Sequence, residues 1–223
     1  AKRTSDEYGV WLENLMDREN LSSGDITDVI IASVVPETLF SLKSLCRKYY
    51  KCDPLIIGDK TVDVGIEVFA SDVGADRLVN AAAAHSRYTG PLIVIDFGTA
   101  TTFDIVDSEG NYYGGVIAPG INLSLDALHM AAANLPRIAV QKPKNVIGKG
   151  TVTAMLSGVY WGYVSLIEGL IKRIIEEFDA PMSVVATGGL APLFSEATDM
   201  IEYLDTDLTL RGLSEIYYRN IQI

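Results

Sequence analysis

Hydrophobic and polar positions follow two periods along the chain, and each period predicts a different kind of element. Apolar residues recur every three or four positions in the segments expected to be helical, and short apolar runs mark the expected strands. The predicted helices cover residues 5–20, 36–49, 71–88, 119–136, 152–178 and 210–220. The predicted strands lie in residues 28–35, 53–58, 91–97, 101–106, 112–118 and 182–187.

Helices and strands alternate along most of the chain, which predicts the α/β class. The central segment, residues 91–118, departs from this alternation, because its three predicted strands follow one another without a helix between them. "DSEG" (107–110) is typical of the turn between two antiparallel strands. A weak boundary is expected near residues 89–91 and divides the chain into 1–89 and 90–223.

Composition and charge bear on nucleic-acid binding, on the redox compartment and on membrane association. The chain has 223 residues and a formal net charge of −11, which argues against general nucleic-acid binding because a phosphate backbone would be repelled. The two cysteines, Cys46 and Cys52, form no CxxC pair, which favours a reducing compartment. No signal peptide and no apolar run of membrane-spanning length is found, so a cytoplasmic location and no membrane partner are expected.

The stretch "LIVIDFGTATTFDIV" (92–106) interrupts a buried strand with polar residues. Gly98 allows close approach to a ligand, and its turn is expected to direct backbone N–H groups toward an anion. Thr99 and Thr102 add hydroxyl donors for phosphate, and Asp96 could hold a cation. Asp104 is expected on the same side as Asp96. The alternative is an ordinary hairpin whose Asp and Thr side chains satisfy the turn backbone.

A second glycine turn, "ATGGLAP" (186–192), joins a strand to a helix and contains Gly188 and Gly189. Such a turn suits a nucleotide lying across a helix start, although strand–Gly–helix junctions are common in α/β proteins. No GxGxxG follows a strand, and "GKGT" (148–151) departs from a P-loop at two required positions.

"VGADRLVNAA" (73–82) places Asp76 and Arg77 at the front of a predicted helix. Free backbone donors there favour an ionised carboxylate, which could accept a proton from a substrate hydroxyl while the arginine holds a substrate carboxylate. An acid in a first helical turn followed by a surface arginine is the commoner explanation. Together the three segments supply the parts that phosphoryl transfer requires.

Six segments in this order resemble a type III pantothenate kinase: "GADR", "DFGTATTFDIV", "GGVIAPG", "ALHMAAANLP", "GKGT" and "ATGGLAP". The resemblance covers essentially the whole chain. It implies the actin-like ATPase fold, which is ribonuclease H-like with two similar subdomains, and ATP-dependent phosphorylation of pantothenate in coenzyme A synthesis. It also implies a monovalent cation such as potassium or ammonium, magnesium with the nucleotide, and a homodimer.

Carried over motif by motif, the resemblance assigns residues to roles. Asp76 would be the proton acceptor, and Asp96 would hold the monovalent cation. The implied pantothenate contacts are Gly74, Ala75, Asp76, Arg77 and Thr151, the last near the dimer interface. The implied nucleotide contacts are Thr99, Gly98, Thr102, Gly188 and Gly189.

Two departures from the family pattern are present. The family's first strand and Asp-x-Gly-Asn-Thr loop have no counterpart before "KRTSDEY", so the first subdomain is expected to lack its N-terminal strand-turn-strand and an upstream piece is expected to be missing. The segment before "GADR" is also short, and Phe69 is the candidate for the family's aromatic substrate contact. The rival functions are another small-molecule kinase of the superfamily and a non-catalytic accessory protein with the same fold.

Overall fold

The computed structural model describes residues 3–131 and 135–221. They form two compact units, each treated by itself below. The first comprises Ala1–Gly65, Asp72–Val79 and Leu210–Ile223, and the second comprises Ile66–Ser71 and Asn80–Thr209. The division falls inside helix α3 (Ala75–Arg87), and the last residues join the first unit. The boundary of two subdomains at residues 89 and 90 therefore stays a prediction.

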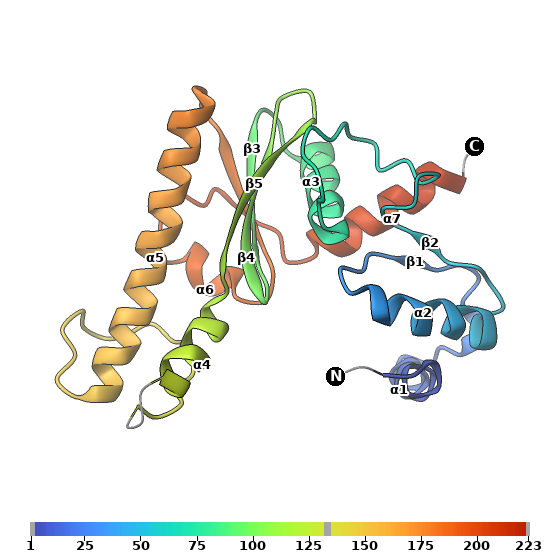
Figure 1. The fold of residues 1–223 in the computed structure, drawn as a ribbon, viewed down its shortest axis with the longest axis horizontal. Coiled ribbons are helices and arrows are strands. Elements are labelled where there is room, and N and C mark those ends of the chain that lie inside the picture. The colour runs from blue at the N-terminus through green and yellow to red at the C-terminus, as the bar shows by residue number, and fades with distance from the viewer. Residues whose placement is uncertain (1–2, 132–134, 222–223) are drawn as a thin grey trace. The chain divides into compact units, whose positions relative to one another are not determined.

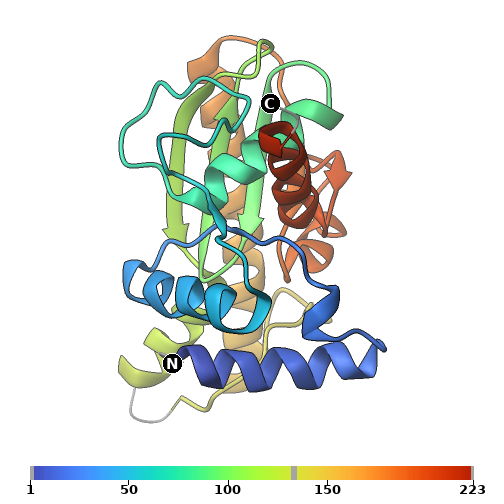
Figure 2. The same ribbon diagram turned by 90° about the vertical axis from the view of Figure 1, so that its right-hand side faces the viewer.

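In the first unit, helix α1 (Ser5–Arg18) begins at the first residue of the helix predicted over residues 5–20. The cap is Thr4, whose hydroxyl accepts from the Glu7 N–H at 3.3 Å, while the Glu7 carboxylate accepts from the Thr4 N–H at 2.7 Å. This reciprocal pair satisfies two N–H groups that the first turn would leave unbonded. Helix α1 lies beside α2 (Pro36–Leu45), as Figures 1 and 2 both show.

Two short parallel strands complete the centre of the first unit. Strand β1 (Ile30–Ile31) pairs with β2 (Leu55–Ile56), so the strand predicted over residues 28–35 is much shorter than expected. The helix that starts at Pro36 continues as the π-helical turn η2 (Cys46–Tyr50), close to the predicted end at residue 49. A short 3₁₀ turn, η1 (Ser23–Asp25), precedes β1.

Helix α7 (Leu208–Ile221) is held to the first unit near its end. The Asn220 side chain accepts from the Asp63 N–H and donates to the Asp63 carbonyl, both at 2.9 Å. These two bonds link positions 157 residues apart in the chain. No local pattern in the sequence predicts such a link.

The second unit is built on a five-stranded sheet of order β5-β4-β3-β6-β7. The antiparallel meander is confirmed, and β6 and β7 then run parallel to β3. Strand β7 was not predicted, because two exposed residues carry no periodic signal. The strands are β3 (Leu92–Phe97), β4 (Ala100–Val106), β5 (Tyr112–Pro119), β6 (Ser183–Thr187) and β7 (Tyr203–Leu204).

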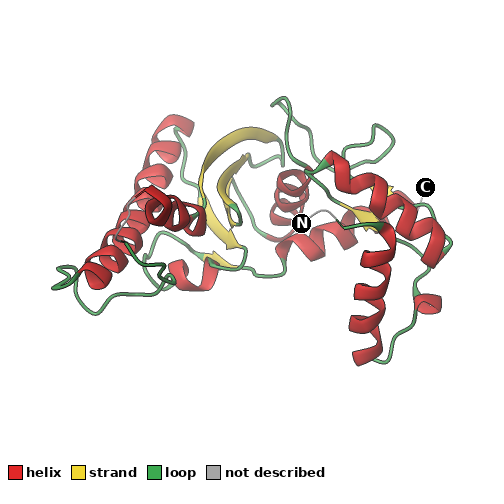
Figure 3. Cartoon of the chain, turned by 60° about the horizontal axis from the view of Figure 1, so that its bottom comes forward, coloured by secondary structure: helices red, strands yellow, loops and turns green. Residues whose placement is uncertain are grey.

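One face of this sheet carries the main core. Ile93, Ile95 and Phe103 point toward helix α5 (Thr151–Phe178), which contributes Tyr160 and Ile167. Figure 1 shows α5 lying along the sheet, and in Figure 3 the strands stand beside this long helix. Among the described residues α5 alone is long and apolar enough to cross a membrane, but its apolar residues pack on the sheet. They are therefore explained by core packing.

The opposite face of the sheet is polar near the carboxyl end of β3. Side chains alternate along a strand, so Asp96, Thr102 and Asp104 lie on the face away from α5. The second half of α3 covers this face with alanines, since Ala81 and Ala84 are fully buried (Figure 1). The mixed α/β class is thus confirmed.

Two further helices belong to this unit. Helix α4 (Ile121–Ala131) ends before the predicted limit at residue 136, and residues 132–134 lie outside the described part of the chain. Helix α6 (Ala191–Ser195) follows the second glycine turn.

Candidate active site

The centre of the candidate site in the second unit is the carboxyl end of β3. In the sheet register Asp96 stands opposite Thr102 of β4 on one side and Thr187 of β6 on the other. Directly paired residues have neighbouring side chains, so these three polar groups gather on one face. Both predicted glycine turns start at this point, one after β3 and one after β6. The structure therefore brings together two motifs that lie about ninety residues apart in the sequence.

The Asp96 carboxylate is half-buried and held from two directions. Its Oδ2 accepts a hydrogen bond of 3.1 Å from Nδ2 of Asn80 on α3. Its Oδ1 lies against the second glycine turn, because a Cβ atom built on Gly188 would stand 2.6 Å from it. The backbone of Gly188 is in the left-handed region, with φ of 91°. Glycine is required there for both reasons.

The turn between β3 and β4 differs in one respect from its prediction. The Gly98 N–H does not point outward, because it donates to the Ala100 carbonyl at 3.1 Å within the turn. Gly98 itself is exposed, outside the left-handed region, and a Cβ there would meet the Ala100 oxygen at 3.4 Å. The turn therefore has no structural need for glycine at this position. A role of Gly98 in leaving space for a ligand stays a prediction.

Gly120, the last residue of the "GGVIAPG" segment, packs against the same turn. A Cβ atom on Gly120 would lie 2.2 Å from the Thr99 carbonyl oxygen and 2.9 Å from that of Gly98. The two carbonyls of the turn thus face Gly120. The Thr99 side chain, on an exposed residue, is left as the group that the turn can offer to a nucleotide.

Tyr163 of α5 anchors this arrangement from the core. Its hydroxyl shares a hydrogen bond with the Thr101 hydroxyl and donates to the Pro119 carbonyl at 3.3 Å. Burial raises the pKa of Tyr163, against a smaller lowering by the Thr101 bond, so the phenol stays protonated at neutral pH. Tyr163 and its neighbour Tyr160 are core residues.

The Thr102 hydroxyl is already engaged in the structure. It donates to Oδ2 of Asp104 at 3.0 Å, and the Tyr112 hydroxyl donates to Oδ1 of the same carboxylate at 2.7 Å. Asp104 is fully buried and lies on the side of the sheet that carries Asp96, as expected. Since a hydroxyl has one proton, Thr102 cannot donate to phosphate while it donates to Asp104. A direct role for Thr102 in nucleotide binding stays a prediction.

In the second glycine turn, Gly188 and Gly189 have different surroundings. Gly189 is exposed, and a Cβ there would meet nothing within 4 Å. The Ala191 N–H donates to the Gly188 carbonyl at 3.1 Å and closes the turn before α6. Gly188 therefore shapes the turn, and Gly189 leaves open space beside it.

The predicted substrate residues open helix α3 in the first unit. The Asp76 carboxylate is half-buried and accepts from the Arg77 N–H at 2.9 Å through Oδ1. A Cβ atom on Gly74 would lie 2.7 Å from that oxygen and 3.2 Å from Val34. The Leu78 N–H bonds the Gly74 carbonyl and starts the helix. Gly74 thus lets the carboxylate lie close to the backbone at the helix N-terminus.

Thr151 is the first residue of α5 and is exposed, one position after the cap Gly150. A hollow of about 420 Å³ lies beside it. Its lining includes Lys142, Lys144 and Lys149, so this part of an acidic chain gathers positive charge. Phe69, the candidate aromatic contact, is exposed and packs edge-on against Tyr113 at 5.4 Å between ring centres.

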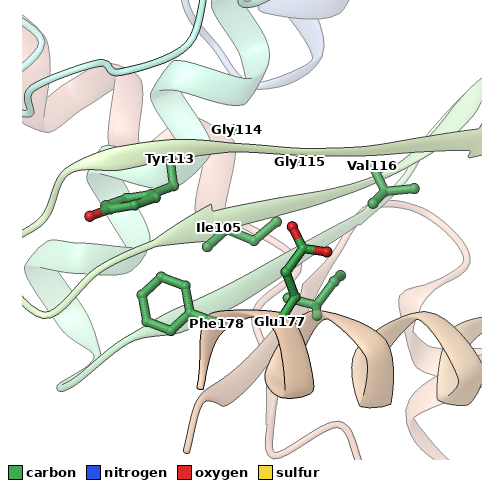
Figure 4. A pocket seen from close by; sticks show the side chains of 8 residues that line it. Ile105, Tyr113, Gly114, Gly115, Val116, Glu177 and Phe178 are labelled. Atoms are coloured by element: carbon green, nitrogen blue, oxygen red, sulfur yellow. The ribbon is translucent and has the colours of Figure 1, made fainter. Parts of the chain in front are cut away.

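A second hollow lies on the α5 side of the sheet, away from Asp96. It holds about 500 Å³ between Tyr113 and Val116 of β5 and the last turns of α5. Figure 4 shows the Glu177 carboxylate projecting into it between Ile105 and Val116. An acidic side chain among apolar ones does not suit a phosphate group.

Few side chains that could bind a metal ion lie close together in the described part of the chain. Residues 3–131 and 135–221 contain no group of three or more His, Cys, Asp or Glu side chains placed to hold a metal ion. A monovalent cation fits Asp96, because one carboxylate together with hydroxyl and carbonyl oxygens gives the oxygen ligands such ions take. Magnesium would need the phosphates of the nucleotide as its main ligands.

Sequence reasoning missed Asn80, which contacts Asp96. The signal was present, since an asparagine one turn after Asp76 stands in an alanine-rich buried stretch, and a buried amide requires partners. Tyr112 was missed as a partner of Asp104 because the pairing depends on strand register.

Comparison with known proteins identifies the family of the chain. A family model described as type III pantothenate kinase matches residues 1–173. The chain belongs to the type III pantothenate kinase family.

Relatives named type III pantothenate kinase are similar over nearly the whole chain. The one from Paramagnetospirillum magneticum is 64% identical and is matched over 99% of this chain and 86% of its own length. The one from Rhodospirillum rubrum is 65% identical, with 99% and 87% covered. A solved structure described as a Baf family transcriptional activator from Campylobacter jejuni superposes with a TM-score of 0.62 at 21% identity, covering 89% of this chain and 85% of that one. At that identity it shows the fold alone.

Proposed function

We propose that this type III pantothenate kinase transfers the terminal phosphate of ATP to the hydroxyl of pantothenate, the first step of coenzyme A synthesis. The family match and relatives at 64% and 65% identity over the chain support this function. The single structural observation that carries it is the meeting of both glycine turns at the Asp96 carboxylate. The relatives at 64% and 65% identity are named as kinases, which argues against the rival view of a non-catalytic accessory protein.

The Asp76 carboxylate is the proposed proton acceptor. Pantothenate has a primary hydroxyl and a carboxylate, and Asp76 and Arg77 stand next to each other at the start of α3. Asp76 takes the hydroxyl proton as the oxygen attacks the phosphorus atom, and the Arg77 guanidinium binds the substrate carboxylate. Gly74 and Ala75, at the N-terminus of the same helix, are proposed as further pantothenate contacts. Thr151 is proposed as a further pantothenate contact.

The nucleotide contacts are proposed at the two turns of the second unit. Gly98 and Gly189 provide space for the phosphates, because neither position needs glycine for its own backbone. The Thr99 hydroxyl can donate to phosphate, and Gly188 keeps the second turn against Asp96. The Thr102 hydroxyl donates to Asp104 and could donate to a phosphate only if nucleotide binding breaks that hydrogen bond. A monovalent cation at Asp96, potassium or ammonium, and magnesium on the nucleotide would neutralise phosphate charge.

The remaining proposals concern the whole protein. The sheet order β5-β4-β3-β6-β7, a meander followed by parallel strands, is the one expected of a ribonuclease H-like subdomain and supports the actin-like fold. A homodimer and a cytoplasmic location are proposed from the family. Phe69 stays the candidate for the aromatic substrate contact.

The test is phosphate transfer to pantothenate by the full-length protein, compared with a panel of other small-molecule alcohols. We expect pantothenate to be the preferred acceptor, and Asp76→Asn to lower kcat by about 10²–10⁴-fold with little change in the KM for ATP, because a general base acts in the transition state. Asp72→Asn, an exposed acid just before α3, is the matched control. Full activity of Asp76→Asn would remove the base assignment, and a better acceptor would remove the substrate.

A further inference from the structure

The Asp96 carboxylate is oriented by a buried hydrogen-bond chain that begins outside the sheet. Asn80 on α3 is 1% exposed and uses both ends of its side-chain amide. Its Nδ2 donates to Asp96 Oδ2 at 3.1 Å, and its Oδ1 accepts from the Thr209 hydroxyl at 2.6 Å. A carboxylate cannot donate, so the nitrogen of the amide must face Asp96. The Thr209 hydroxyl stabilises that orientation.

The position of Asn80 on α3 limits the movement of the Asp96 carboxylate. Asn80 is the first residue of the part of α3 that belongs to the second unit, the unit that also contains Asp96 and Thr209. The alanines that follow Asn80 are buried against the sheet and fix the helix there. Asp96 Oδ2 is held by Asn80 and Oδ1 lies at the Gly188 turn, so the carboxylate has little freedom to rotate.

We propose that Asn80 is a positioning residue that fixes the Asp96 carboxylate for a monovalent cation, and that Thr209 holds the Asn80 amide in the required orientation. The inference rests on the proposed role of Asp96. A cation bound by a single carboxylate depends on the orientation of that carboxylate, because the carboxylate supplies the charge that attracts the ion. Loss of the amide would leave Asp96 able to turn and would weaken cation binding more than it weakens the fold.

The first experiment measures cation binding without catalysis, on the full-length protein. The melting temperature is recorded against KCl concentration, with choline chloride at equal ionic strength as the reference. We expect potassium to raise the melting temperature of the wild type and to have no effect on Asp96→Asn. Asn80→Ala should need about tenfold more potassium for half of the effect, because a hydrogen bond to a charged group is lost. Thr209→Val should need about threefold more.

Thr198→Val is the matched control, since Thr198 is a buried threonine of the same unit that bonds only its local turn. Its potassium response should equal that of the wild type. Thr209→Val keeps the test decisive if Asn80→Ala does not fold, because it removes only a hydroxyl. Kinase assays should show the same shifts in the potassium concentration for half-maximal rate, with kcat at saturating potassium within about threefold of wild type.

Asn80→Asp gives a signature that a purely structural role would not produce. The introduced carboxyl faces the Asp96 carboxylate, so its ionised form repels it, whereas its protonated form can donate as the amide does. We expect the potassium response of this variant to recover as the pH is lowered from 8 to about 5.5, a shift absent from the wild type.

The outcomes distinguish the cation role of Asp96 from the positioning role of Asn80. If Asp96→Asn keeps the potassium response, the cation role of Asp96 is wrong, and the role of Asn80 falls with it. If Asp96→Asn loses the response while Asn80→Ala and Thr209→Val match the Thr198→Val control, the cation role stands and the positioning role is wrong.

Discussion

At the scale of single residues, the four glycines around Asp96 have different roles. Gly188 is required by the fold, since its φ is 91° and a Cβ would lie 2.8 Å from both the nitrogen and the oxygen of Phe97. Gly120 is required because a Cβ would collide with the turn above it. Gly98 and Gly189 have neither restriction. These two positions are the ones proposed to leave space for the phosphates of the nucleotide.

This difference predicts opposite results for two similar substitutions. We expect Gly98→Ala to change the melting temperature little but to raise the KM for ATP about tenfold, because a methyl group enters the space of the phosphates. Gly188→Ala should lower the free energy of unfolding by about 1–3 kcal/mol through backbone strain and collision with Asp96. Thermal unfolding and steady-state kinetics on both variants check this. An unchanged KM in Gly98→Ala would contradict the placement of the phosphates.

At the scale of elements, the β4–β5 hairpin shows how one carboxylate organises a turn. Asp107 accepts from the Glu109 N–H at 2.9 Å and from the Asn111 N–H and side-chain amide at 2.8 Å each. Partial burial raises the pKa of Asp107, but the hydrogen bonds from Asn111 and from the backbone of the turn outweigh it and lower the pKa below its ordinary 3.8. The "DSEG" segment thus turns the chain as predicted, closed by Gly110 with φ of 90°.

The lowered pKa of Asp107 has a defined consequence for stability. The ionised Asp107 carboxylate contributes to the free energy of unfolding. This contribution is fully present above pH 3.8 and is lost as the pH falls through the lower pKa of the folded state. We expect Asp107→Asn to lower the free energy of unfolding by about 1 kcal/mol at pH 7 and by much less near pH 2.5. Denaturant unfolding at both pH values checks this, with the exposed Asp199→Asn as control. An equal effect at both pH values would show that the charge is not responsible.

At the scale of the whole molecule, one end of the second unit exposes apolar side chains. Helix α4 exposes Leu123 and Met130, and the segment before α5 exposes Val146 and Ile147, the last at 81%. Figure 1 shows α4 and the start of α5 at the same end of this unit. Exposed apolar groups that cluster in this way are typical of protein interfaces. The cluster lies next to Thr151, which the resemblance places near the dimer interface. This agreement supports the proposed homodimer.

The homodimer can be tested through Ile147. We expect Ile147→Asp to weaken self-association at least tenfold, because a buried unpaired charge at an interface costs several kcal/mol. Sedimentation at several protein concentrations measures this, with Phe40→Asp as the control because Phe40 is 79% exposed in the first unit. If neither variant changes the sedimentation coefficient, the α4 end is not the interface.

Much of the element order could be predicted from the sequence because it depends on local patterns. The limits of β3, β4 and β5 agree with the predicted strands within about one residue. The errors have local physical causes. Strand β7 was missed because two residues are too few to show a period, and β1 is much shorter than the apolar run over residues 28–35.

The sequence alone determined the family, the α/β class and the candidate residues, because ordered motifs and hydrophobic periods are properties of the chain itself. Only the tertiary structure decided which of these residues meet. Parallel pairing of β3 with β6 places Gly188 against Asp96, and α3 packing gives Asp96 its partner Asn80. Such contacts join residues far apart in the chain, and they depend on strand order and helix packing that no local pattern contains.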